Sequence, residues 1–175
     1  MTPPSLPHVQ RGVFLLEVLI AIAIFAVGIL AMISMQAVSI AAQNDSQYRA
    51  EAEHLIDQLT AQMRITVAHD PTTGNVNSTS FAGFAHQSTT DSQCVFSGTA
   101  STSTVITDWI KTVKGQDSSG NAMAGKGLPG VTDARIQIQT DDTTTAGLNQ
   151  VKVTICWQAG NDRTAHAHSV VAYID

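Results

Sequence analysis

Residues 11–34, RGVFLLEVLIAIAIFAVGILAMIS, carry a single carboxylate, Glu17, near the start of an apolar run. No other charged side chain occurs between Val13 and Ile33, a span of about 21 residues, which is the length a helix needs to cross a hydrocarbon core of about 30 Å. An unpaired carboxylate in that environment costs a few kcal/mol even on lenient insertion scales. The stretch therefore predicts a membrane-spanning helix, and Glu17 requires a partner that offsets its cost.

The apolar residues are unevenly distributed along the chain. The chain has 175 residues and a formal net charge of −5, with nine Lys and Arg against fourteen Asp and Glu. This length suits one domain with an appended segment, or one modest domain alone. Lys and Arg form no cluster or stripe, so the sequence provides no basis for a nucleic-acid partner. Apolar residues concentrate at 13–42, whereas later segments are rich in Ser, Thr, Gly and Asn.

The charges that flank the apolar run predict its orientation. Arg11 precedes the run, and no further Lys or Arg occurs until Arg49. Because basic residues are retained on the cytoplasmic side of a span, we expect a cytoplasmic N-terminus and an outward-facing C-terminal domain. A secretory signal has an apolar region of only about 7–15 residues, which this run exceeds. A plain single-span anchor would explain length and orientation but leaves Glu17 unexplained.

The segment RGVFLLEVLIAIAIFAVGIL resembles the class III signal of type IV prepilins and pseudopilins. The resemblance implies that residues 1–12 are a prepilin leader peptide and that a prepilin peptidase cleaves between Gly12 and Val13. The new amine of Val13 would then be methylated, and Glu17 would become the fifth residue of the mature chain. Val13 departs from the family pattern, in which Phe or Met is commoner at this position.

The resemblance also implies a partner for Glu17. When processed subunits pack helix to helix, Glu17 of one subunit can neutralise the cationic amine of Val13 in its neighbour. Two buried charges that each destabilise alone become tolerable as a pair. We therefore expect Glu17 to set the axial stagger between subunits, with no catalytic role. The implied partners are other major and minor pilins, the prepilin peptidase, the inner-membrane assembly machinery and the membrane itself.

A long helix without proline is predicted for residues 13–70, with one glycine, Gly28. Residues 13–35 would form the transmembrane or filament-core helix, and residues 36–70 its amphipathic continuation. Pro71 is the predicted stop, since the residue before a proline is biased away from helical geometry. The helix would be about 85 Å long at 1.5 Å per residue. Apolar residues of the second part recur at helical spacing: Tyr48, Ala52, Leu55, Ile56, Leu59, Met63 and Val67.

Residues 71–175 are predicted to form a globular α+β head. The Ser- and Thr-rich range 72–104 is typical of a loop-rich connection, and 104–114 predicts a short helix with apolar side chains on one face. Alternating apolar residues over 133–175 predict an antiparallel meander of three or four strands, with turns at DDTTTAGLN and AGNDRTAH. The predicted fold is α+β and type IV pilin-like, with the small sheet covering the amphipathic half of the helix.

Further segments are similar to PilV-type minor pilins, the type IV pilus modification proteins: VGILAMISMQ (27–36), DWIKTV (108–113) with GLPG (127–130), VTICWQ (153–158) and HSVVAYI (168–174). The similarity implies a minor pilin of a priming or tip complex that supports pilus biogenesis, adhesion or twitching motility. It would reside in the bacterial inner membrane before assembly, and in the pilus or periplasm afterwards. Two alternatives stay open, a minor pseudopilin of a type II secretion system and a membrane-anchored periplasmic binding domain.

Cys94 and Cys156 are too few and too far apart for a zinc-finger pattern. In an oxidising compartment outside the inner membrane they can form a disulfide; two buried free thiols are the alternative. Cys156 alternates with Ile155 and Trp157, so it would point away from the helix and tie the 72–104 connection to the outer sheet face. Closing a loop of about 60 residues stabilises by about 4 kcal/mol in the chain-entropy model.

No motif predicts catalysis or a cofactor. His166 and His168 share one face of a predicted strand, but the sequence offers no third metal ligand, so a solvated strand edge is favoured over a metal site. The serine residues lie in no nucleophile-elbow context, and no phosphate-binding loop occurs. The sequence therefore predicts a structural protein without enzymatic activity, cofactor or metal.

Overall fold

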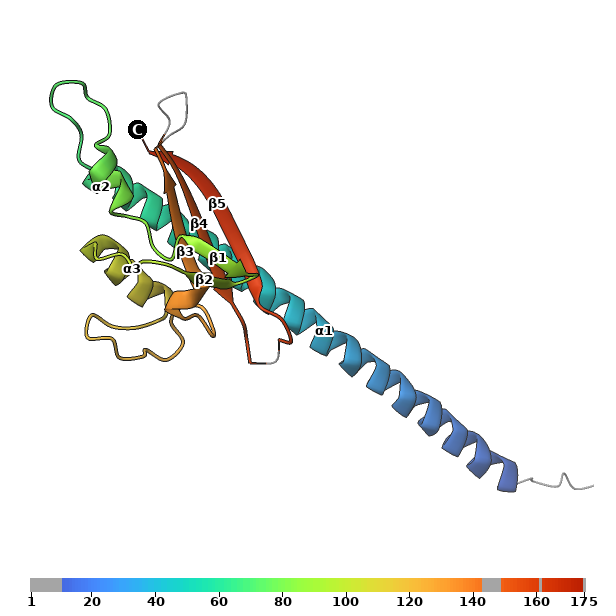
Figure 1. The fold of residues 1–175 in the computed structure, drawn as a ribbon. Helices are drawn as coiled ribbons and strands as arrows, with labels where there is room; N and C mark the ends of the chain where they lie inside the picture. The colour runs from blue at the N-terminus through green and yellow to red at the C-terminus, as the bar shows by residue number, and fades with distance from the viewer. Residues whose placement is uncertain (1–10, 143–148, 161, 175) are drawn as a thin grey trace, which may run out of the picture. The chain divides into compact units, whose positions relative to one another are not determined.

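The computed structural model describes residues 11–142, 149–160 and 162–174. Most of the predicted leader and most of the predicted turn DDTTTAGLN lie outside the described residues. The described elements have the predicted α+β class, a long N-terminal helix with two small antiparallel sheets (Figure 1).

The chain divides into two compact units, residues 1–46 and 47–175. Helix α1 (Arg11–Thr66) is continuous and contributes to both units. In the first unit every described side chain from Phe14 to Gln36 is exposed. Among the described residues, one helix is long and apolar enough to cross a membrane, and no residue of its most apolar stretch is buried. A helix that is apolar on all sides needs lipid or other helices around it.

The second unit contains a three-stranded antiparallel sheet, which confirms the predicted meander. Its strands are β3 (Ile136–Asp141), β4 (Asn149–Trp157) and β5 (His166–Ile174), in the order β3-β4-β5. The register aligns Ile138 with Val153 and Val153 with Val170. Because side chains alternate between the two faces of a strand, one face carries the apolar set that joins the core: Ile136, Ile138, Val151, Val153, Ile155, Trp157, Val170, Ala172 and Ile174.

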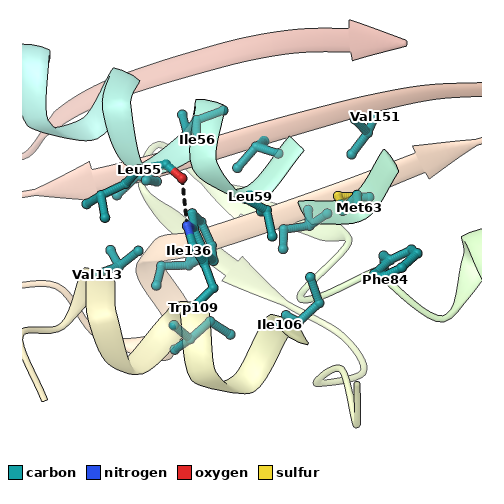
Figure 2. Packing of buried hydrophobic residues seen from close by; sticks show 14 of the residues in the cluster. Leu55, Ile56, Leu59, Met63, Phe84, Ile106, Trp109, Val113, Ile136 and Val151 are labelled. Atoms are coloured by element: carbon teal, nitrogen blue, oxygen red, sulfur yellow. Dashed lines mark hydrogen bonds between the residues drawn. The ribbon is translucent and has the colours of Figure 1, made fainter. Parts of the chain in front are cut away.

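The second part of α1 packs its predicted apolar stripe into the same core as this sheet face (Figure 2). The stripe residues that are buried are Ala52, Leu55, Ile56, Leu59, Met63 and Val67, with Tyr48 partly buried beside them. Helical periodicity on one element and strand alternation on the other thus bury complementary surfaces, as predicted. Burial of each large aliphatic side chain contributes about 1.5–3 kcal/mol.

Helix α3 (Thr104–Val113) closes another side of the core. Its buried residues Ile106, Trp109, Ile110 and Val113 lie on one helical face, as the sequence predicts, while Val105 is only partly buried. The indole Nε1–H of Trp109 donates a hydrogen bond to the main-chain oxygen of Leu55 at 2.7 Å (Figure 2). A buried indole needs such a partner, so this bond fixes α3 against α1.

The GLPG segment, residues 127–130, is held tightly against the end of α3. Leu128 is buried and its amide donates to the oxygen of Val113, and the amide of Gln158 donates to the oxygen of Pro129, both at 2.9 Å. A Cβ atom on Gly127 would lie 2.2 Å from the nitrogen of Gly115, and both glycines have positive φ. Only glycine permits this backbone approach, so the segment is a packed part of the head.

Helix α1 ends at Thr66, short of the predicted Asp70. Residues 67–77 turn back on themselves instead, closed by a bridge between His69 and Val76. The Asp70 carboxylate accepts hydrogen bonds from the amides of Thr72 and Thr73, and these bonds lower the pKa of Asp70 below its ordinary value. A side chain that binds amides two and three residues ahead stabilises a turn in place of another helical turn.

The connection 72–104 holds more regular structure than a loop-rich segment suggests. It contains α2 (Ser78–Ala82), and a hairpin of β1 (Thr89–Ser92) and β2 (Val95–Ser97) that forms the second sheet. Phe81 of α2 and Phe96 of β2 are buried. A short 3₁₀ helix, η1 (Asp133–Arg135), precedes β3.

Candidate functional site

Glu17 lies on the exposed first part of α1, where its neighbours one turn away are Val13, in the first turns of the helix, and Ile20. Within the described residues no hydrogen bond or ion pair engages the Glu17 carboxylate, and exposed apolar side chains surround it along the helix, Phe14 and Leu16 among them. The geometry therefore offers a carboxylate on an apolar surface, one turn from the predicted cleavage point.

The backbone at Gly12 and Val13 is already helical. Cleavage before Val13 would place a cationic amine at the first residue of a helix, where the unpaired N–H groups of the first turn add positive charge. Glu17 would then stand four residues from that cationic end. An apolar surface that holds a carboxylate and a nearby ammonium can bind a copy of itself by exchanging the two charges between chains.

Cys94 and Cys156 form a disulfide that joins residues 62 apart in the sequence. Cys156 is fully buried on the face of β4 opposite the helix, where Cys94, Phe96 and the partly buried Ala165 form a separate apolar cluster. The disulfide thus ties the β1–β2 hairpin to the outer sheet face, the location that strand alternation predicts.

Hydrogen bonds reinforce the contact between the hairpin and the outer face. The side-chain amide Nε2 of Gln137, in β3, donates to the main-chain oxygen of Gln87 at 3.2 Å and to the hydroxyl of Thr90 at 3.0 Å. Gln137 is buried with these partners, and a satisfied buried amide specifies where the hairpin sits. Sequence reasoning missed this role, because an alternating Gln is typical of a solvated face.

His166 and His168 lie on the edge strand β5, but their side chains are less solvated than we expect from the sequence. They pair with Trp157 and Ile155 of β4 on the helix-facing side of the sheet, and both are only partly exposed. His166 stacks on the fully buried Trp157, with ring centroids 6.1 Å apart, and its Nε2 lies 3.4 Å from an Asp162 oxygen. Within the described residues no cluster of three metal-ligating side chains occurs.

Arg49 of α1 lies over the ring of Trp157, with its guanidinium carbon 5.9 Å from the ring centroid. A guanidinium at that distance is attracted to an aromatic face. Arg49 and His166 therefore both pack on Trp157, at the junction of α1, β4 and β5. The sequence carries no signal for this contact, because Arg49 lies far along the chain from Trp157 and His166.

His86 is a buried residue that sequence reasoning also missed. It is 3% exposed, and its Nδ1 accepts a hydrogen bond from the amide of Ser101 at 3.2 Å. Burial lowers the pKa of His86 below its ordinary value of 6.5, because the imidazolium loses its hydration; the nearby Asp133 opposes this shift. The neutral ring is therefore the form that the fold accommodates.

No protein-family model, curated protein or solved structure matches this chain. The fold itself, a long N-terminal apolar helix over a small antiparallel sheet, is consistent with a pilin-like protein.

Proposed function

We propose that this chain is a minor type IV pilin, a structural component of a priming or tip complex that supports pilus biogenesis, adhesion or twitching motility. The observation that carries the proposal is the combination of Gly12, Val13 and Glu17 at the start of a long apolar run. Each residue contributes differently, because the glycine permits cleavage, the new amine of Val13 supplies a cation, and Glu17 supplies the anion.

The pattern of burial supports assembly by helix packing. Residues 14–36 expose apolar side chains on all sides, so they require lipid before assembly and other helices afterwards. In that surrounding an unpaired Glu17 is expensive, and the amine of Val13 in a neighbouring subunit offsets the cost. The pairing also selects one axial position, because any other stagger leaves both charges buried and unpaired.

The head supports the PilV-type assignment through its GLPG segment. Leu128 and Pro129 connect the end of α3 to Gln158 after β4, so the motif joins two parts of the head that the resemblance also names. The head contributes surfaces for recognition by other subunits, and the disulfide suits an oxidising location outside the inner membrane.

The mature N-terminus tests the proposal. Mass spectrometry of the native chain should find N-methylated Val13 as the first residue. A chain that still carries residues 1–12 while functioning normally would contradict the proposal and favour an uncleaved anchor with a binding domain.

Deletion of the gene separates pili from secretion. A minor pilin predicts loss or reduction of surface pili with protein secretion intact. Loss of secretion with normal pili would instead assign the chain as a minor pseudopilin of a type II secretion system, which shares the same leader chemistry.

A further inference from the structure

Strand β5 has an open hydrogen-bonding edge, whereas the opposite edge of the sheet is closed. Among the strands that the structure describes, the order β3-β4-β5 leaves one side of β5 without a neighbouring strand. On the other side of the sheet, the amides of Ile138 and His86 exchange hydrogen bonds with each other's oxygens at 2.8 and 3.0 Å, which closes the middle of the β3 edge. The two edges therefore differ in what they offer to another chain.

The groups that face the open edge can be assigned from two contacts. The oxygen of Ile174 accepts a hydrogen bond from the side-chain amide Nδ2 of Asn149, its partner residue in β4, so this oxygen faces β4. The oxygen of Tyr173 accepts one from Arg64 of α1 at 3.1 Å, so its backbone faces outward. Since successive residues of an antiparallel strand alternate in direction, Ala167, Ser169 and Val171 also present their N–H and C=O groups outward.

These outward groups form a template for another strand. Within the described residues, no backbone group outside the sheet pairs with Ala167, Ser169 or Val171. Their side chains are exposed on the outer sheet face, with Val171 and Tyr173 each 45% exposed. The strand, HAHSVVAYI, contains no proline, glycine, lysine or acidic residue. It therefore lacks the devices by which proteins usually protect an edge from pairing.

A second copy of this chain does not suit the edge. Strand β5 runs in the same direction as residues 47–66 of α1, because Arg49 lies at the Trp157 end of the sheet and Arg64 at the Tyr173 end. An antiparallel β5–β5 pair would place the two Gln47 ends, and the chains leading to the two anchors, at opposite ends of the heads. A parallel pair cannot close about a twofold axis, since a parallel ladder offsets the two strands by one residue.

Head-to-tail pairing of identical copies is also disfavoured. It would require the β5 edge of one copy to meet the β3 edge of the next, and the His86 bridge occupies that edge at Ile138. The pattern of open and closed edges thus points to a chain of a different sequence.

We infer that the edge of β5 from Ala167 to Val171 binds an extended strand from a non-identical pilin-like subunit, so that the partner extends the sheet as a fourth strand. Pairing stops at Tyr173, where Arg64 occupies the outward oxygen. The partner strand places apolar or β-branched side chains beside Val171 on the outer face, the favoured cross-strand neighbours there. This inference rests on the proposed function, because it takes the partner to be another anchored subunit.

The edge can be tested with a pair of proline variants. Val171→Pro removes one outward N–H from the β5 edge and leaves the β4–β5 ladder intact, because that N–H is not part of the ladder. The matched control is Thr140→Pro, which removes an outward N–H from the β3 edge. Losing one interchain hydrogen bond and leaving its acceptor unpaired should lower incorporation of Val171→Pro into sheared pili about tenfold, with Thr140→Pro at the wild-type level.

Hydrogen exchange on the wild-type protein keeps the test independent of the variants' folding. We compare the full-length chain in detergent with the chain in sheared pili, at single-amide resolution. The amides of Ala167, Ser169 and Val171 should exchange about tenfold or more slowly in pili, while the amide of Thr140 is unchanged. Equal exchange of the β5 amides in both states would overturn the inference.

Photo-crosslinking identifies the occupant of the edge. With a benzophenone amino acid at position 169, the inference predicts a product that joins β5 to an extended segment of a different protein with a class III signal. A product with a second copy of this chain, or no product from pili, would overturn it. If Val13 is the processed N-terminus and Val171→Pro still incorporates normally, the inference fails while the proposed function stands. If the chain keeps residues 1–12, the proposed function itself fails.

Discussion

Residues 14–36 and 47–66 belong to one helix, yet their apolar side chains differ in what covers them. In the first range every described side chain is exposed, and the apolar residues surround the helix. In the second range one stripe is apolar and its members are buried under the sheet and α3. A stripe can be covered by the chain's own head, whereas an apolar surface on all sides must be covered by something else. The stability of the head is therefore internal, and that of the first range depends on its surroundings.

The largest expected effect comes from the charge in the first range. Glu17→Ala should leave membrane insertion and cleavage after Gly12 intact, but should abolish incorporation into pili. Breaking a buried ion pair by removing one partner costs about 3–5 kcal/mol. Here the cost arises because the amine of Val13 would be buried without a partner. Immunoblots of sheared pili against membrane fractions measure the loss.

The control sharpens the contrast between the two ranges. Glu53→Ala removes an exposed carboxylate from the second part of the same helix and should incorporate normally. Glu17→Ala in sheared pili at the wild-type level would count against charge pairing.

The disulfide tests whether the head is stabilised internally. Replacing both Cys94 and Cys156 by Ser removes a link between residues 62 apart, and should lower the free energy of unfolding of the head by about 4 kcal/mol. Urea unfolding of the full chain in detergent, followed by the fluorescence of Trp109 and Trp157, measures the change. Reduction of the wild-type protein should lower its unfolding midpoint to that of the double variant. If both samples keep the midpoint of the oxidised wild type, the disulfide has no stabilising role.

A pair of leucines compares the two ranges directly. Leu59 is fully buried and Leu30 is 64% exposed. Leu59→Ala should lower the free energy of unfolding of the head by about 3 kcal/mol, through lost burial and the cavity that remains. Leu30→Ala should leave the same transition within about 0.5 kcal/mol of wild type. Equal losses in the two variants would show that the first range also takes part in the head's cooperative unit.

The smallest expected effect is a pH dependence confined to the head. Because burial lowers the pKa of His86 in the folded state, the unfolded chain binds a proton first as the pH falls. The contribution of neutral His86 to the free energy of unfolding is therefore fully present above about pH 6.5, the ordinary pKa of histidine. It decreases as the pH falls below that value. His86→Gln should flatten the change in melting temperature between pH 7 and pH 5. The exposed His54 gives the control: if His54→Gln flattens the profile equally, His86 is not the responsible group.

Local patterns in the sequence were sufficient for much of this fold. Helical spacing from Ala52 to Met63 identified the buried stripe, and alternation in β3 and β4 identified the inner face of the sheet. The position of Cys156 between Ile155 and Trp157 placed the disulfide on the outer face. These predictions succeed because the period of a helix or strand is set by backbone geometry, and so the pattern of apolar residues states directly which face must be buried.

Tertiary structure alone decided the features that depend on contacts between distant segments. The Ser- and Thr-rich connection has no strong period, so only its packing on Gln137 and Cys156 reveals the β1–β2 hairpin. Likewise His86 closes the edge of β3 from fifty-odd positions away, and Arg49 meets His166 only through Trp157. The physical reason is that periodicity describes one segment at a time. The closing of a strand edge or the burial of a polar side chain depends instead on which other segment packs against it. The sequence by itself determined an apolar helix with one charge, an amphipathic continuation and a sheet with one apolar face; the tertiary structure decided which edge of that sheet stays open.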